Sequence, residues 1–445
     1  MQDFSQGKIG RQIIFFSVPI ILGNLFMQLY QIVDSVIVGQ YLGKEALAAV
    51  GASMPVVFAV VSLVIGIGSG ASVVISQYFG AKNDEKVRIT SDTLHVFLLV
   101  MGVLIGLVGI FGSRTIFELL RLPPELIPMA TDYLQVYLGG VFMLFGFNTI
   151  VAILRGVGDS KTPLYFLIFS AFLNVGLDLL FIVTFGWGVA SAAWATVIAT
   201  AAAYVMIILY VNHNKKIIFH INFLKLHFDR KIFKQCVDYG LPTGLQQAFV
   251  ALGGVALMGI ANGFGTDVIA GFSSAMRVDA LAVIPSMSFA MALTSFTGQN
   301  IGAGRIDRVR KGLFSTLLFS SIICLVITIA IVVLGRQIIS LFTTDAAVTD
   351  YGAEYLVVVS SFYILFSTMF IINGMLRGAG AVMFTMFATL LALWGIRIPA
   401  ALILVPLIGA SGIWWSIPIG WAVGMTASIL YYRSGKWKEK SIFKK

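Results

Sequence analysis

Asp34 is a carboxylate in the middle of an apolar stretch, residues 19–39, that is long enough to cross a lipid bilayer. An aspartate at the centre of a membrane helix costs about 2.5–3.5 kcal/mol to insert, so such a residue usually marks an ion or substrate pathway. Met27, Tyr30 and Gln31 precede Asp34 by seven, four and three residues and therefore share its helical face. We interpret this face as one wall of a polar cavity. The structural alternative is a helix end at which Asp34 reaches water.

A second acid, Asp178, lies in another apolar stretch. Asn174 precedes it by four residues, so the amide and the carboxylate share one helical face. Thr196 adds a hydroxyl in the next apolar stretch. Two carboxylates, an amide oxygen and a hydroxyl are hard oxygen ligands suited to Na⁺, and two neighbouring acids can also hold a proton. The alternative for Asn174 and Asp178 is a hydrogen bond that only joins two helices.

The second half of the chain carries a different set of charges within apolar stretches. Arg277 and Asp279 are two residues apart and therefore lie on different helical faces, while Arg397 occurs in a later stretch. We interpret the three as an interhelical ion-pair set with a structural role, and substrate contact is the alternative.

The composition is that of a membrane protein that crosses the bilayer many times. Apolar residues make up 58% of the 445 and charged residues only 11%, which excludes a water-soluble globule with an ordinary surface. No cleavable signal peptide is recognised near the start. Two cysteines are too few for a disulfide framework, and the four histidines form no metal-binding pattern. No metal cofactor is therefore expected.

The hydropathy pattern predicts an all-α protein with twelve membrane-spanning helices. The predicted spans are 13–38, 47–76, 92–113, 130–153, 162–184, 187–211, 236–262, 268–296, 312–335, 352–376, 383–406 and 409–432. Residues 212–235 are long, basic and polar, and we interpret them as a cytoplasmic linker. The predicted domains are an N-terminal lobe over 1–211 and a C-terminal lobe with a basic tail over 236–445, each with six spans.

Lysine and arginine are concentrated on one side of the predicted membrane. Of the 30 basic residues, 24 fall on the side of the N-terminus, four fall on the opposite side, and two lie within spans. The positive-inside rule then predicts cytoplasmic termini and a multi-pass location in the plasma (inner) membrane. The cytoplasmic membrane face accounts for the net charge of +10, so no nucleic-acid partner is expected.

The two halves repeat the same motifs at a fixed offset. Residues 77–81 correspond to 299–303, and the Leu-Arg-Gly-x-Gly motif at 154–158 corresponds to 376–380, each pair being 222 residues apart. Because each half has an even number of spans, both halves enter the membrane from the same side. The lobes are therefore predicted to be related by a pseudo-two-fold axis along the membrane normal, and rocking of the lobes would give alternating access to a central cavity.

These features together resemble the MATE (multidrug and toxic compound extrusion) family. The likeness rests on the twelve spans in two parallel repeats, the segment from Pro19 to Asp34, the repeated glycine motifs, and Asn174 with Asp178. It covers nearly the whole chain and is strongest to the prokaryotic branch that resembles the DNA-damage-inducible transporters. The resemblance implies that Asp34, Asn174, Asp178 and Thr196 bind the coupling cation and that Pro19 bends the first helix.

The resemblance also implies the activity and its partners. It indicates an antiporter, driven by Na⁺ or H⁺ and without an organic cofactor, that exports amphipathic and often cationic small molecules. The substrate cavity is expected beside Met27, Tyr30, Gln31 and Asn148. Membrane lipid is the other expected partner, and the protein is expected to be a monomer.

In the other bacterial branch of the family, acids in spans seven and ten also serve the cation. This chain instead has Gln246 and Gln247 in span seven and Ala381 in span ten, so no cation site is expected in the C-terminal lobe. Two other functions are the alternatives to an antiporter. A lipid-linked oligosaccharide flippase of the same superfamily would require more helices or a cationic cavity, and a membrane enzyme would require a catalytic set that the predicted loops do not provide.

Overall fold

The computed structural model describes residues 1–444, and no strand occurs among them. Lys445, the last residue of the predicted C-terminal lobe, lies outside the described residues. Ten helices are long and apolar enough to cross a membrane, and two bent helix pairs raise the number to twelve if each pair forms one span. The predicted all-α membrane architecture is therefore confirmed.

The chain forms two compact units whose boundaries fall inside helices. The first unit comprises Met1–Asp3 and Leu22–Gly244, and the second comprises Phe4–Ile21 and Leu245–Lys445. The first boundary divides the first long helix two residues after Pro19, and the second divides the eighth helix two residues after Pro242. The two prolines are themselves related by the sequence repeat, so both halves of the chain change unit at equivalent points.

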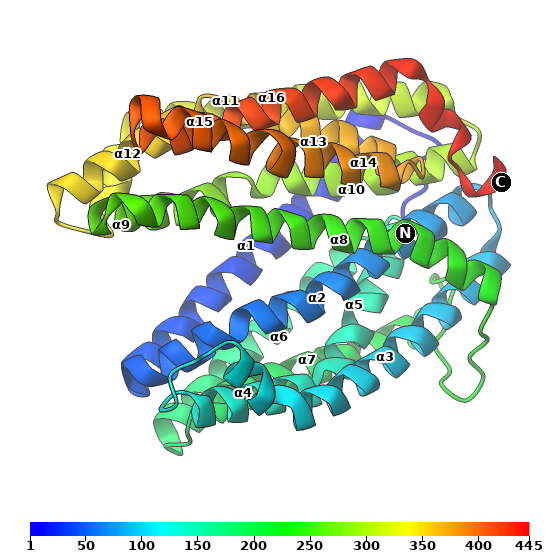
Figure 1. Ribbon diagram of the computed structural model, residues 1–445. Helices are drawn as coiled ribbons and strands as arrows, with labels where there is room; N and C mark the ends of the chain where they lie inside the picture. The colour runs from blue at the N-terminus through cyan, green and yellow to red at the C-terminus, as the bar shows by residue number, and fades with distance from the viewer. Residues whose placement is uncertain (445) are drawn as a thin grey trace. The chain divides into compact units, whose positions relative to one another are not determined.

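The first unit holds all four residues predicted for the cation site. It contains the longer part of α1 (Ile9–Tyr41), α2 (Gly43–Gly80), α3 (Asp84–Leu119), α4 (Ile127–Gly139), α5 (Val141–Gly156), α6 (Lys161–Asp178), the π-helical η1 (Leu179–Thr184), α7 (Ala190–His213) and the start of α8 (Arg230–Ala261) (Figure 1). Within it, α3 packs on α4 and α5, and α6 packs on α7. Asn83 caps α3 by accepting the Lys86 N–H at 3.0 Å.

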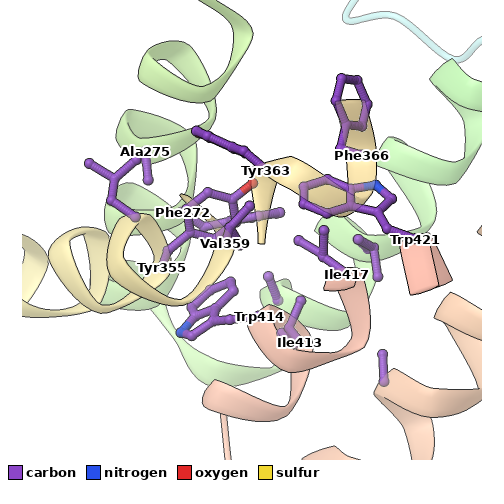
Figure 2. Close-up of a cluster of buried hydrophobic side chains, with 14 of the residues drawn as sticks. Phe272, Ala275, Tyr355, Val359, Tyr363, Phe366, Ile413, Trp414, Ile417 and Trp421 are labelled. Atoms are coloured by element: carbon purple, nitrogen blue, oxygen red, sulfur yellow. The ribbon is translucent and has the colours of Figure 1, made fainter. Parts of the chain in front are cut away.

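The second unit has its own hydrophobic core. Its helices are the end of α8, η2 (Asn262–Phe264), α9 (Thr266–Ala282), α10 (Ile284–Gly302), α11 (Ile306–Ser340), α12 (Ala346–Ser360), α13 (Tyr363–Gly378), α14 (Val382–Leu390), the π-helical η3 (Leu391–Arg397), α15 (Ile398–Ile408), α16 (Ser411–Ser434), η4 (Lys436–Glu439) and η5 (Ile442–Lys444). Figure 2 shows the aromatic centre of this core, where the Trp414 ring lies 5.2 Å from Phe272 and 5.3 Å from Tyr355. Aromatic pairs at such distances add to the stability that burial gives.

Two predicted spans are bent, and they occupy equivalent places in the repeat. Span four is α4 followed by α5 with a bend of 46°, and span ten is α12 followed by α13 with a bend of 50°. In α4 the bend follows Gly139 and Gly140, which have low helix propensity. The sequence pattern predicted single spans at both places because hydropathy alone does not record a change of direction.

In the first unit, α2 and α8 cross at very short range through glycines. Gly66 and Gly70 on α2 face Gly244 and Gly240 on α8, and a Cβ atom added at Gly70 would collide with the Gly240 backbone. Each pair of glycines is spaced by four residues, which is the small-residue pattern that lets membrane helices approach closely. The start of α8 is therefore fixed to the first unit by backbone-to-backbone packing.

The N-terminal segment belongs to the second unit. Phe4, Phe16 and Ile20 are buried in a cluster that includes Phe296, and the Phe4 ring lies 5.0 Å from Phe16 and 5.7 Å from Phe296. The buried Arg308 guanidinium donates to the backbone oxygens of Phe4, Gln6 and Gly7 and to Gln12 Oε1. Gln299 accepts from the Phe4 N–H and Asn300 donates to the Phe4 backbone oxygen, so side chains of α10 and α11 together hold this polar stretch.

Candidate functional site

Asp34 and Asp178 meet inside the first unit, although 144 residues separate them in the sequence. Asp34 comes from α1 and is half-buried, and Asp178 is the last residue of α6 and is fully buried. Their carboxyl groups are close enough for a hydrogen bond to each other. The structure therefore places the two acids of the predicted cation site side by side, and cation binding by this pair stays a prediction.

Three of the four carboxyl oxygens of this pair have no hydrogen-bond donor among the described residues. Asp34 Oδ1 and both Asp178 oxygens are buried, and no described group donates a hydrogen bond to them. Two ionised carboxylates can only accept, so they stay in contact when a proton or a cation lies between them. The acid pair therefore has the chemistry of a site that binds and releases one proton or one monovalent cation.

Asn174 and Thr196 complete the oxygen set, from α6 and α7. The buried Asn174 side chain donates from Nδ2 to Thr196 Oγ1 at 3.3 Å, and that hydroxyl donates to the Ala192 backbone oxygen at 3.1 Å. This geometry leaves Asn174 Oδ1 buried and without a donor. Asn174 Oδ1 lies one helical turn from Asp178 and can serve as a neutral ligand beside the carboxylates.

The chain changes its helical geometry directly after Asp178. The π-helical segment η1 starts at Leu179, and the repeat-related span in the second unit also contains a π-helical segment, η3, which ends at Arg397. Such segments are common at functional sites, because they leave carbonyl groups less tightly paired than in an α-helix. Neither π-helical segment was predicted from the sequence.

Two tyrosines lie near the acid pair, and a third packs on one of them. Tyr30 on α1 and the buried Tyr133 on α4 both lie within electrostatic range of Asp34 and Asp178. The Tyr137 ring, one turn further along α4, stacks on Tyr133 at 6.2 Å. Sequence analysis predicted Tyr30 on this face but missed Tyr133 and Tyr137. Tyr133 could have been found from the internal repeat, because Asp132-Tyr133-Leu134 corresponds to Glu354-Tyr355-Leu356.

The remaining residues of the predicted substrate wall are less closely tied to the acids. Met27 and Gln31 on α1 are exposed, as a cavity wall requires. Asn148 on α5 is half-buried and donates from Nδ2 to the Leu144 backbone oxygen of its own helix at 2.8 Å. Within residues 1–444, no hydrogen bond connects Asn148 to the acid pair.

The three predicted intramembrane charges of the second unit, Arg277, Asp279 and Arg397, do not form one ion-pair set. Asp279 accepts a hydrogen bond from the Tyr363 hydroxyl at 2.6 Å and lies within electrostatic range of Arg397 and Tyr355. Tyr355 and Tyr363 belong to the aromatic core drawn in Figure 2. The described residues show no ion pair within 4.0 Å for Asp279, Arg397 or the exposed Arg277. The direct partner of Asp279 is therefore a tyrosine.

The neutral residues at the corresponding places of the second unit are engaged in packing. Gln246 on α8 donates to Thr389 Oγ1 on α14 at 2.6 Å, and Ala381 is buried. Among the described residues, no group of three or more His, Cys, Asp or Glu side chains could hold a metal ion. Both cysteines are buried free thiols.

Comparison with known proteins gives consistent relatives along the whole chain. The MatE family profile matches residues 19–180 and 242–403, once for each half of the repeat. The "Probable multidrug resistance protein YpnP" of Bacillus subtilis (strain 168) is 33% identical over 99% of this chain and 98% of the relative. The "Probable multidrug resistance protein YoeA" of the same strain is 30% identical over 99% of this chain and 97% of the relative.

A solved structure supports the same relationship. The chain is similar to a multidrug resistance MATE family transporter of the MOP superfamily in an outward-facing conformation, with a TM-score of 0.92 at 26% identity and coverage of 98% of both chains. The expectation that the protein is a transporter and not an enzyme is thereby confirmed. The family profile matches both halves of the chain, and the fold agrees over nearly its whole length, so the chain belongs to the MATE family of membrane transporters.

Proposed function

We propose that this protein is a cation-driven antiporter that exports amphipathic, often cationic compounds across the plasma membrane. The relatives named as probable multidrug resistance proteins support the substrate class. The observation that supports the coupling mechanism is the close approach of the Asp34 and Asp178 carboxyl groups, three of whose oxygens are buried without a donor among the described residues.

In this mechanism the acid pair alternates between two loaded states. A Na⁺ ion or a proton relieves the repulsion between the carboxylates, and Asn174 and Thr196 add neutral oxygens. A cationic substrate that approaches along Met27, Tyr30 and Gln31 competes for the same negative charge. Binding of one cation therefore favours release of the other, which is the requirement for antiport.

The membrane supplies the energy for the cycle. Each charge that moves through the full potential gains about 2.3 kcal/mol per 100 mV, which exceeds thermal energy several-fold. We further propose cytoplasmic termini and a basic cytoplasmic connection between α7 and α8, as the distribution of lysine and arginine indicates. In this orientation an inward cation gradient drives export.

The first prediction concerns the two acids. Asp34→Asn and Asp178→Asn keep the size of the side chain but remove its charge, so each variant should reach the membrane and lose gradient-driven efflux, by about 100-fold or more. The measurement is efflux of a fluorescent amphipathic cation from proteoliposomes with an imposed pH or Na⁺ gradient. Imposing each gradient separately also identifies the coupling ion.

The matched control is Asp132→Asn, because Asp132 is an exposed carboxylate on α4 beside Tyr133. This variant should transport at the wild-type rate. Full gradient-driven efflux by both Asp34→Asn and Asp178→Asn, at equal protein levels, would exclude the proposed coupling mechanism.

A further inference from the structure

A small basic pocket lies at one end of the second unit, far along the chain from the proposed cation site. It has a volume of about 270 Å³ and is formed where α11, the end of α16 and η4 meet. Three cationic and three aromatic side chains with one glycine form its lining, namely Arg310, Phe314, Tyr432, Arg433, Gly435, Trp437 and Lys438. No carboxylate belongs to this lining.

The pocket wall is a fixed structure and not a loose tail. Gly435 ends α16 with a left-handed φ of 71°, which turns the chain back toward the helix end. The Trp437 indole is buried, donates from Nε1 to the Tyr432 backbone oxygen at 3.0 Å, and stacks on the Tyr432 ring at 6.0 Å. Lys438 Nζ then lies over the Trp437 ring, 6.0 Å from its centroid. Lys438 is thereby placed beside a fixed aromatic wall, and the exposed Arg310 and Arg433 lie at the same pocket.

The three cations of the pocket lack acidic partners. Within residues 1–444, no carboxylate lies within 4.0 Å of the charged groups of Arg310, Arg433 or Lys438. Nearby arginines of the same helix are differently placed, since Arg305 pairs with Asp307 at 3.6 Å and Arg308 binds the N-terminal segment. Like charges gathered without a counter-ion repel one another, and an anion with several acceptor oxygens would relieve this repulsion.

The surroundings of the pocket identify the source of that anion. The pocket lies at the end of α16, the last apolar helix, and at the start of α11, another apolar helix. Phe314, one turn after Arg310 on α11, is 63% exposed and offers an apolar surface beside the charges. The volume is below the 300–1,000 Å³ usual for drug-sized ligands, so the pocket fits a headgroup better than a transported drug.

We propose that this pocket binds the phosphate-bearing headgroup of an anionic phospholipid, with the acyl chains along Phe314 and the apolar face of α11. The guanidinium groups of Arg310 and Arg433 donate to the phosphate oxygens, and Lys438 adds a third charge. Basic pockets between membrane helices bind such headgroups in this way. The site is separate from the acid pair, so the lipid is a structural ligand and not an exported substrate.

The test compares lipid binding by purified full-length protein in neutral detergent. Phosphatidylglycerol is added in increasing amounts, and bound lipid is counted by native mass spectrometry. Phosphatidylcholine is the control, because its zwitterionic headgroup carries a phosphate but no net charge. Phosphatidylglycerol should bind at least tenfold more tightly than phosphatidylcholine. The double variant Arg310→Gln with Arg433→Gln should lose about tenfold in affinity for phosphatidylglycerol, because two charge-assisted contacts are removed.

Lys436→Gln is the matched control, since it removes one exposed charge in the same turn but outside the pocket. It should bind phosphatidylglycerol like the wild type, and the variant Arg310→Lys with Arg433→Lys should recover part of the affinity. Equal binding of the two lipids, or an equal loss in Lys436→Gln and the double glutamine variant, would overturn the proposal. Displacement of the lipid by millimolar inorganic phosphate would assign the pocket to a free anion and would also overturn it.

Discussion

Asn174 can either join two helices or act as a ligand of the cation, and the two roles can be tested separately. Its amide nitrogen joins α6 to α7 through Thr196, while its buried oxygen has no donor. If the oxygen is a ligand, Asn174→Leu should raise the cation concentration for half-maximal efflux about tenfold or more, because a buried neutral ligand is lost. The measurement is efflux from proteoliposomes at a series of Na⁺ concentrations or pH values.

Asn148→Leu is the comparison for this prediction, because the Asn148 amide donates only within its own helix. It should leave the cation dependence unchanged, although affinity for the substrate can change. An unaltered cation dependence in Asn174→Leu, together with a lower melting temperature, would reduce Asn174 to a helix-joining residue.

At the residue scale the sequence identified the acids and missed the aromatic residues around them. Asp34, Asn174 and Asp178 are polar residues in apolar stretches, and the cost of placing them there makes them easy to recognise. Tyr133 and Tyr137 are common residue types in an apolar helix. Their insertion carries no large free-energy cost, so the sequence does not distinguish them from their neighbours. Only the folded chain packs α4 on α2, α3 and α7 and brings Tyr133 within electrostatic range of the acid pair.

The glycine crossing of α2 and α8 gives a prediction at the scale of elements. Gly70→Ala should lower the melting temperature of the purified protein strongly, with a loss of about 2 kcal/mol or more, because the new Cβ would meet the Gly240 backbone. Gly51→Ala on the same helix is the control, since nothing lies within 4 Å of a Cβ at Gly51. That variant should be neutral or more stable by up to about 1 kcal/mol.

Equal melting temperatures for Gly70→Ala and Gly51→Ala would show that α2 and α8 can separate enough to accept a Cβ at Gly70, and would contradict the prediction. The two glycine pairs could have been read from the sequence, because both follow the small-residue pattern. The partner of each pair could not be read, since glycine pairs are frequent in this chain and spacing does not identify the facing helix.

Asp229 gives a second prediction at the scale of elements, and it depends on pH. This carboxylate caps α8 by accepting the N–H groups of Ile232 at 3.0 Å and Lys231 at 2.7 Å, and Lys86 lies 3.9 Å away. The backbone N–H of Ile232, followed by that of Lys231 and the charge of Lys86, lowers the pKa of Asp229 below its usual value. The ionised carboxylate therefore stabilises the fold at neutral pH, and the contribution fades as the pH falls through the lowered pKa.

Asp229→Asn retains a capping oxygen but removes the charge, so it isolates this electrostatic part. At pH 7 the variant should be less stable than the wild type by about 0.5–1 kcal/mol, and the two melting temperatures should converge below about pH 4. A difference that stays constant from pH 7 to pH 3 would contradict the assignment. Asp132→Asn, with its exposed carboxylate, serves as the control.

At the scale of the whole molecule, the number of spans followed from hydropathy but their interruptions did not. The bends within spans four and ten and the π-helical segments η1 and η3 occur in repeat-related spans. Apolar composition is the same for a straight and a bent helix, so the sequence pattern has no information on these changes. The internal repeat, in contrast, was visible because motifs keep their spacing over 222 residues.

The charge distribution gives the prediction for the whole molecule. Reporter fusions at Lys225 and after Lys445 should both report a cytoplasmic location, because 24 of the 30 basic residues fall on that side. The assay uses a reporter pair in which one enzyme is active only outside and the other only inside. A fusion at Arg121, on the opposite side, is the control, and an external signal from Lys225 or Lys445 would refute the orientation.

The start of α1 belongs to the second unit and the start of α8 belongs to the first unit. This arrangement has a consequence for the order in which the protein folds during synthesis. Phe4–Ile21 is synthesised well before its hydrophobic partners Phe289, Phe296 and Leu313, which follow almost 300 residues later. Until α10 and α11 are made, this segment has no native surface to pack against. A chain cut in the 214–229 connection would therefore release two incomplete halves, each holding a piece of the other, and neither half could finish folding alone.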